Sequence, residues 1–140
     1  MARNFTLNFP STAFGPALST TGPTYVNHGT TPFSRVGLAF DDSVDENAAT
    51  GMFVMPSEYT GSGTLKADVC YYTASATSGD VAFLVALEAI TDGDSVDMEA
   101  AHSADLSGTA GTKTVPGTAG NPDILTFTLT AKDSVAAGDI

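Results

Sequence analysis

Two clusters of acidic residues are the groups in this sequence that could hold a cation. Ca²⁺ binds several carboxylate and carbonyl oxygens that come from one loop. The cluster that begins at Asp92 lacks the sixth-position glycine of an EF-hand loop, and Ser103 stands where that loop has its closing glutamate. We therefore expect solvated turn acids and no bound metal, with Asp92, Asp94 and Asp97 as the alternative set of cation ligands. In chain order, the two clusters are Asp41, Asp42, Asp45 and Glu46, and Asp92, Asp94, Asp97 and Glu99.

Side chains suited to covalent or acid–base catalysis are few. Nucleophilic catalysis needs a nucleophile, a base and an orienting group, and only His28 and His102 supply an imidazole. Cys70 falls within a predicted strand, where a packed thiol is the simpler interpretation. Glycosidase acids need a cleft lined with aromatic rings, and the chain has no Trp. We expect no catalytic residues, no cofactor and no enzymatic activity.

The charge of the chain excludes further classes of protein. Its 140 residues carry 16 acidic and five basic side chains, a net charge of −11. Nucleic-acid binding needs Lys and Arg to displace counterions, so we expect no nucleic-acid partner. No run of apolar residues approaches the roughly 20 that a membrane helix needs. The N-terminal segment alternates polar and apolar residues, whereas a signal peptide has a continuous apolar run there. We expect a soluble protein, made in a cytoplasm, with no membrane partner.

Alternation of polar and apolar residues predicts β-strands along most of the chain. Two further runs, 52–55 and 81–90, are apolar on both faces, so each is expected to be buried on both sides or against another subunit. Residues 103–120 are small and polar and predict a long surface loop with one short segment at 112–115. One short helix is predicted over 96–104. The strictly alternating segments, predicted as half-buried strands, are 3–9, 35–40, 64–73 and 125–131.

The turns between these segments decide the expected architecture. Many short strands with frequent turn signals are typical of an all-β protein, here an antiparallel β-sandwich or jelly roll. Residues 1–33 are rich in Pro, Thr and Phe and predict an extended N-terminal arm with a first strand. Residues 34–140 are predicted to form the jelly-roll domain.

Short motifs along the chain are similar to those of one group of viral proteins. An aromatic residue precedes Asp-Asp at 40–42, and Met-Pro-Ser-Glu-Tyr stands at 55–59. Tyr-x-Ala-x-Ala-Thr-Ser-Gly-Asp-Val follows at 72–81, and Asp-Gly-Asp at 92–94. Val-Pro-Gly-Thr-Ala-Gly at 115–120 and Ala-Ala-Gly-Asp at 136–139 add to the pattern. Together these motifs resemble the small jelly-roll domains of tailed-phage virion proteins.

The resemblance implies a structural role in a virion. Such domains serve as capsid decoration (cement) proteins or as tail-fibre heads, usually as trimers. We expect a cement protein that binds the outside of the shell, with the major capsid protein and copies of itself, as a homotrimer, for partners. The alternative is a tail-fibre head that recognises host-surface glycans. The expected subunit or capsid interface comprises Phe5, Leu7, Phe9, Phe14, Tyr72, Leu84 and Ala86.

Two departures from the family pattern affect the expected sheet. Tyr71, Tyr72 and Phe83 stand in the strands around the Thr-Ser-Gly-Asp turn, where the family often has Trp. Such domains also continue past the final Gly-Asp pair into another strand. We therefore expect the domain at 34–140 either to lack its last strand or to have its sheet completed by a neighbouring chain.

Overall fold

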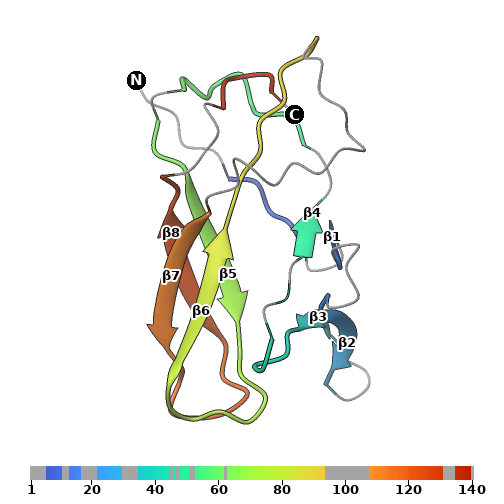
Figure 1. The fold of residues 1–140 in the computed structure, drawn as a ribbon, viewed down its shortest axis with the longest axis vertical. Coiled ribbons are helices and arrows are strands. Elements are labelled where there is room, and N and C mark those ends of the chain that lie inside the picture. The colour runs from blue at the N-terminus through green and yellow to red at the C-terminus, as the bar shows by residue number, and fades with distance from the viewer. Residues whose placement is uncertain are drawn as a thin grey trace. The chain divides into compact units, whose positions relative to one another are not determined.

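The structure, a computed structural model, consists of antiparallel strand pairs (Figure 1). It describes residues 6–10, 13–16, 22–29, 35–44, 46, 48–50, 53–61, 63–93, 108–130 and 135–139. These residues contain eight strands and no helix, so the predicted β-rich fold is confirmed. The strands are β1 (Phe14–Pro16), β2 (Thr24–His28), β3 (Arg35–Ala39), β4 (Ala48–Thr50), β5 (Lys66–Tyr71), β6 (Asp80–Val85), β7 (Thr109–Thr114) and β8 (Asp123–Thr128).

The chain divides into two compact units, residues 1–53 and 54–140. In the first unit β1 pairs with β4 and β2 pairs with β3, so the inner pair is nested within the outer one along the chain. The Phe9 ring contacts two other rings, with centroids 6.3 Å from Phe14 and 5.1 Å from Phe53. The Tyr25 hydroxyl donates a hydrogen bond to the carbonyl oxygen of Phe14. Aromatic contacts and one tyrosine hydroxyl therefore hold the short strands of this unit.

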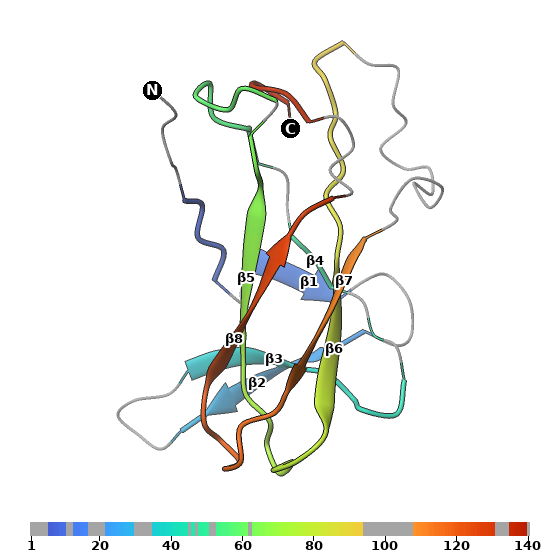
Figure 2. The same ribbon diagram turned by 90° about the vertical axis from the view of Figure 1, so that its left-hand side faces the viewer.

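The second unit repeats the nested pairing with longer strands. Here β5 pairs with β8 and β6 pairs with β7, each over six residues. Successive residues in all four strands alternate between more and less exposed, as expected of a sheet with one covered face. The covered faces meet: the Tyr71 and Phe83 rings are 5.6 Å apart, and a β-carbon on Gly111 would lie 2.6 Å from the Phe127 ring. Figure 2 shows the two pairs side by side.

Three of the four alternating segments form the predicted strands. Segment 64–73 contains β5, segment 125–131 overlaps β8, and segment 35–40 contains β3. The alternation also predicts the right face for the two longer strands. Ala67, Val69 and Tyr71 of β5 are partly covered, while Phe127 of β8 is buried. Two-residue periodicity was informative here because one face of each strand packs against other side chains.

Other segments differ from the sequence-based expectations. Thr6–Pro10 forms no strand and ends in a turn, in which the Ala13 amide donates to the Pro10 carbonyl. The run at 52–55 is irregular at Phe53–Met55, because the Met55 backbone pairs with residues 138 and 139 instead of with a strand. The run at 81–90 leaves the strand after Val85. The helix predicted over 96–104 lies outside the described residues.

The loop predicted over 103–120 is wrong for its middle part, where Thr109–Thr114 forms the six-residue strand β7. Its sequence, TAGTKT, has no large apolar side chain, so the hydrophobic pattern gave no strand signal. Two contacts between the β6–β7 pair and the β5–β8 pair hold this segment as a strand instead. The Phe127 ring lies over Gly111, and Lys113 forms an ion pair with Asp123 of β8. The segment is therefore a strand because of its neighbours.

Candidate functional site

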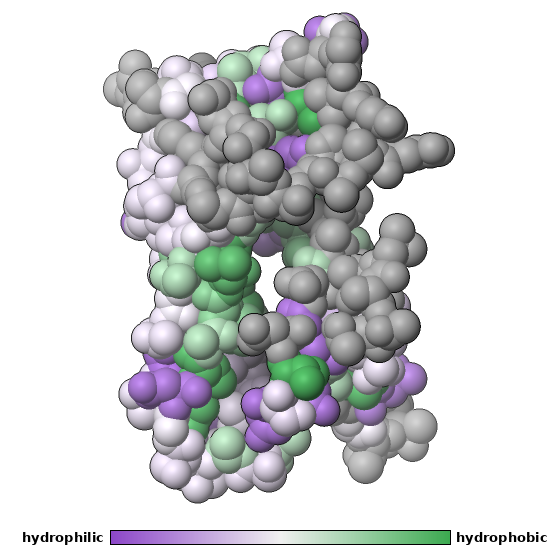
Figure 3. All heavy atoms as spheres, in the orientation of Figure 1, coloured by the Kyte–Doolittle hydropathy of each residue, from purple (hydrophilic) through white to green (hydrophobic). Residues whose placement is uncertain are grey.

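The strongest candidate for a contact surface is an exposed apolar face on the second unit. We call it the β6–β7 outer face; its described residues, all exposed, are Asp80, Ala82, Leu84, Ala86, Ala110, Thr112 and Thr114. Leu84 leaves 64% of its surface exposed. Hydrophobic atoms follow the course of β6 in Figure 3. A surface of this kind can bind a partner by apolar burial.

Strand register fixes the layout of this face. Leu84 is paired with Ala110, and Ala82 is paired with Thr112. Ala86 comes directly after the end of β6 and is exposed. Leu84 is thus one long side chain surrounded by short ones, which makes the face nearly flat with a single projection.

Gly108, just before β7, supports the position of Leu84. A β-carbon built on Gly108 would lie 2.6 Å from Leu84 Cγ and 3.0 Å from Leu84 Cδ1. Real β-carbons do not approach other atoms so closely, so the Leu84 side chain rests against the glycine backbone. The glycine therefore gives Leu84 a defined place on an otherwise small-residue surface.

The outer face of the β5–β8 pair carries more charged side chains. On β5 it carries Lys66 and Asp68, and the Thr126 hydroxyl of β8 donates to Asp68 Oδ1 at 2.6 Å. Cys70 is exposed there and is paired in register with Ile124, which is 50% exposed. Both outer faces thus carry a Thr–Asp hydrogen bond, because on the β6–β7 outer face the Thr114 hydroxyl donates to Asp80 Oδ1 at 2.8 Å, and Lys66 is the further charge on this one.

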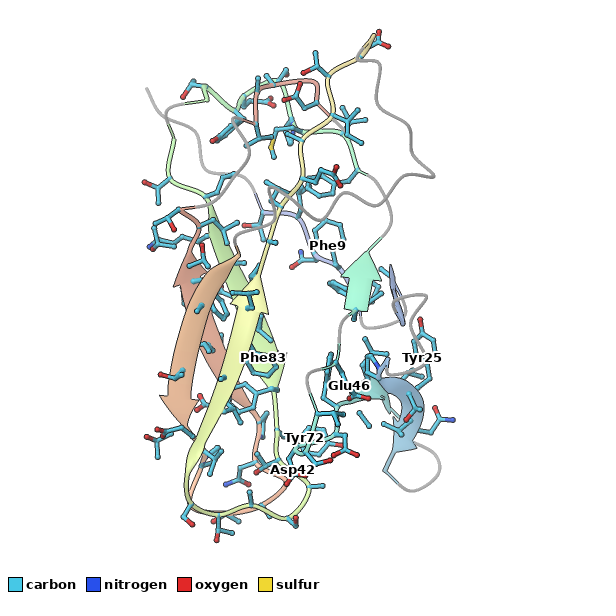
Figure 4. The ribbon with its side chains drawn as sticks, viewed as in Figure 1. Phe9, Tyr25, Asp42, Glu46, Tyr72 and Phe83 are labelled. Atoms are coloured by element: carbon cyan, nitrogen blue, oxygen red, sulfur yellow. The ribbon has the colours of Figure 1, made fainter. Side chains whose placement is uncertain are left out.

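The predicted interface residues fall in several places. Leu84 and Ala86 share the β6–β7 outer face, whereas Tyr72 lies directly after β5 and is partly exposed (Figure 4). Leu7, Phe9 and Phe14 lie in the first unit, where Phe9 and Phe14 contact each other. Phe5 lies outside the described residues. The structure therefore brings together two pairs of the predicted residues, Leu84 with Ala86 and Phe9 with Phe14.

The predicted cation ligands are only partly described. Asp92 is exposed in a turn that precedes Gly93, while Asp94 and Asp97 lie outside the described residues. In the part of the chain that the structure describes, no three His, Cys, Asp or Glu side chains gather to hold a metal ion. The hypothesis of a cation bound by these three residues stays a prediction.

The first acidic cluster has a local structural role. The Asp41 amide donates to Glu46 Oε2 at 2.6 Å, and the Ser43 amide and hydroxyl both donate to Asp41 Oδ1. The hydrogen bonds from Ser43 lower the pKa of the Asp41 carboxyl. Figure 4 shows Asp42 and Glu46 in this connection between β3 and β4. These acids close a turn, as the interpretation of solvated turn acids expects.

A polar cluster formed by residues of β5, β7 and β8 was not predicted from the sequence. Lys113 Nζ donates to Asp123 Oδ1 at 2.6 Å and to the Ile124 carbonyl at 2.7 Å, and the Tyr71 hydroxyl donates to Asp123 Oδ2 at 3.4 Å. The hydrogen bond from Lys113, followed by that from the Ile124 amide, lowers the pKa of the Asp123 carboxyl. Desolvation, and then the charge of Asp123, raise the pKa of Tyr71. There was no sequence signal for this cluster, because Lys113 lies in the segment predicted as a loop and Asp123 precedes the alternating segment 125–131.

A second unpredicted cluster joins two of the motifs. The Met55 amide donates to the Asp139 carbonyl at 2.7 Å, and the Gly138 amide donates to the Met55 carbonyl at 3.0 Å. The Asp139 carboxylate accepts from the Ala136 amide at 2.7 Å and from the Thr91 hydroxyl at 3.1 Å. Met-Pro-Ser-Glu-Tyr and Ala-Ala-Gly-Asp, far apart in the chain, are therefore in direct contact. Both donors to Asp139 are neutral and the carboxylate is buried, which suits a structural role.

Comparison with known proteins adds no relative. No family model, no curated protein and no solved structure matches this chain. None of the described residues forms a helix long and apolar enough to cross a membrane. The function is therefore argued from the residues and surfaces above.

Proposed function

We propose that this protein is a structural component of a tailed-phage virion, a capsid decoration (cement) protein that binds the outside of the shell. The observation that carries the proposal is the β6–β7 outer face, where Leu84 lies exposed on β6 and Ala86 lies exposed directly after that strand ends. A cement protein acts by adding contact area across boundaries between capsid subunits, which stabilises the assembled state by mass action. It needs apolar contact surface and no catalytic group.

The motifs at 40–42, 55–59, 72–81 and 136–139 support the same proposal through their resemblance to phage jelly-roll domains. We propose that the strand pairs belong to such a jelly roll, in which the arm at 1–33 supplies β1 and β2. The support is the nesting of the pairs, β2–β3 within β1–β4 and β6–β7 within β5–β8. Jelly rolls contain eight strands arranged as two Greek keys, and in a Greek key the fourth strand returns to lie beside the first, as β4 pairs with β1 and β8 with β5.

Net charge suits the proposed location. A charge of −11 keeps isolated copies soluble and apart in the host cytoplasm before they bind a shell. The proposed partners are the major capsid protein and copies of this chain, as a homotrimer, with no nucleic acid and no membrane. We propose no enzymatic activity, no metal and no cofactor.

The test is addition of purified protein to capsids that lack it. We expect the protein to bind in a copy number comparable with that of the major capsid protein and to raise the temperature at which the capsids break open. Capsids that bind none of it, or that open at the same temperature with and without it, would contradict the cement function. Binding only at the tail, together with binding to a glycan array, would instead support the tail-fibre alternative.

A further inference from the structure

We propose that the open edge of β5 pairs with the same edge of a second copy of this chain. The two strands run antiparallel, with Lys66 of each copy opposite Asp68 of the other. This inference goes beyond the proposed function and does not depend on it, because it concerns two copies in solution and uses no residue of the β6–β7 outer face.

The hydrogen-bond pattern shows which backbone groups of β5 point away from β8. The Leu129 amide donates to the Leu65 carbonyl at 3.0 Å, so these two residues form a hydrogen-bonded pair. In an antiparallel ladder such residues alternate with residues whose amides and carbonyls point to the opposite side. The outward groups of β5 are therefore those of Lys66, Asp68 and Cys70.

The two edges of the β5–β8 pair differ in what occupies them. On β8 the Ile124 amide donates to Asp123 Oδ1 at 2.8 Å, and the Ile124 carbonyl accepts from Lys113 Nζ at 2.7 Å. On β5 the three outward residues are exposed, and no described residue is hydrogen-bonded to their outward amides and carbonyls. An open strand edge can bind an extended segment through main-chain hydrogen bonds.

The charges along this edge favour a second copy of β5 as the segment that binds. Lys66 and Asp68 lie on the same face of the strand, two residues apart. When two such strands run antiparallel, one register places each lysine opposite the aspartate of the other copy, so two pairs of opposite charges form together. The outward amides and carbonyls of both strands also face each other in this register. Opposite charges in directly opposed positions stabilise a strand pair.

The inner face of β5 fits the same register. Ala67 lies opposite Ala67 of the second copy, and Leu65 lies opposite Val69 of that copy. These side chains are partly covered within one copy, so pairing would join the covered faces into one sheet in the order β8–β5–β5–β8. Exposed ion pairs add little to affinity. The charges therefore select the register, while main-chain hydrogen bonds and apolar side chains hold the copies together.

The edge of β6 lacks this complementarity. The Val115 amide donates to the Gly79 carbonyl at 3.0 Å, so the outward groups of β6 are those of Asp80, Ala82 and Leu84. Asp80 is the one charged residue of these three, and no antiparallel register of two β6 strands gives it an opposite charge. Self-pairing is therefore assigned to β5.

The proposed contact has two-fold symmetry, because the same edge is used on both copies. Pairing occupies the edge of β5 in both copies, so it makes pairs and does not extend into a filament. A homotrimer would use other surfaces, and this contact would then join two trimers.

Sedimentation velocity of the full chain, from low to high micromolar concentration, tests the pairing. The sedimentation coefficient of the wild type should rise with concentration. Asp68→Lys places lysines opposite each other and should weaken the association about tenfold, although it makes the chain less acidic. The matched control is Asp80→Lys, because Asp68 and Asp80 each accept one threonine hydrogen bond on an outer face. The control should associate at least as strongly as the wild type.

Exchange of the two charges guards against a folding defect. The double variant Lys66→Asp with Asp68→Lys keeps the net charge and recreates both opposed pairs in the same register. It should therefore restore the association that Asp68→Lys loses, with a circular dichroism spectrum like that of the wild type.

Cysteine cross-linking tests the register. Directly opposed residues that form no hydrogen bonds with each other have Cα atoms about 4.5 Å apart, a distance that a disulfide can span. Ala67→Cys in a Cys70→Ala background should therefore give a disulfide-linked dimer on oxidation. In the wild type the two Cys70 residues would lie roughly 20 Å apart along the strands, so this contact should not cross-link them.

Three results would overturn the inference. They are a wild type with no concentration dependence, equal association of Asp68→Lys and Asp80→Lys, and a charge exchange that restores nothing. Cross-linking through Cys70 with none at position 67 would overturn the proposed register.

Discussion

The buried carboxylate of Asp139 shows how one residue links distant parts of the second unit. Its side chain is 6% exposed and accepts two hydrogen bonds, from the Ala136 amide and the Thr91 hydroxyl. Its carbonyl accepts a third from the Met55 amide. Met55 and Val135, which belong to the segments that these hydrogen bonds join, are themselves buried. A buried acid is tolerated when its oxygens are satisfied, and here the donors come from three separate segments.

Removing that carboxylate should destabilise the second unit. We expect Asp139→Ala to lower the free energy of unfolding by about 1–3 kcal/mol, because the Ala136 amide and the Thr91 hydroxyl lose their acceptor. Asp139→Asn keeps one acceptor oxygen and should cost less. Urea denaturation followed by circular dichroism measures both. Equal stability of Asp139→Ala and the wild type would show that this cluster contributes nothing to folding.

Asp123 should make stability depend on pH. Lys113 lowers the pKa of the folded Asp123 carboxyl below 3.8, its ordinary value, which the unfolded chain keeps. A lowered folded pKa means that this contribution is present in full above 3.8 and is lost as the pH falls through the folded pKa. The wild type should therefore lose more stability than Asp123→Asn between about pH 5 and pH 2. Urea midpoints at several pH values measure the gap between the two proteins.

The lysine partner provides the check on this interpretation. Lys113→Met should remove part of the same pH dependence, because the carboxyl loses its charged partner. If the gap between the wild type and Asp123→Asn stays constant from neutral to acidic pH, Asp123 does not titrate with a shifted pKa.

At the scale of elements, strand β7 shows that packing can select a strand that its composition does not predict. Its inner positions include Gly111, over which the Phe127 ring lies, and Lys113, which pairs with Asp123. Close packing of protein interiors means that a ring can fit here only because the glycine has no β-carbon. The two ribbons therefore come together through complementary sizes at this point.

Gly111→Ala should test that contact. The added β-carbon would lie 2.6 Å from the Phe127 ring, so the ring or the strand must move, at a cost of about 1–3 kcal/mol in unfolding free energy. Gly117→Ala is the control, because nothing lies within 4 Å of its β-carbon position. Thermal denaturation should give a lower midpoint for Gly111→Ala and little change for Gly117→Ala. Similar midpoints for both variants would show that the ring adjusts without cost.

At the scale of the whole molecule, net charge opposes every contact between copies. The chain carries −11, and salt screens repulsion between exposed charges. Contacts between apolar side chains do not weaken as charges are screened. The balance between repulsion and burial therefore depends on ionic strength.

Self-association should increase with salt. Raising NaCl from low concentration to about 0.5 M should strengthen the association of the wild type, because the repulsion between two acidic copies is screened. Sedimentation velocity at matched protein concentrations measures the effect. Association that weakens as salt rises would show that attraction between charges holds the copies together.

The sequence by itself determined the β-rich class, the faces of β5 and β8, and the charge of the molecule. Periodicity and composition were sufficient for these, because each strand carries its own alternation of apolar and polar residues. Only the tertiary structure decided that β7 is a strand, that Lys113 and Asp123 pair, and that Met55 contacts Gly138 and Asp139. These features depend on which distant segments become neighbours, and no local pattern of side chains records that.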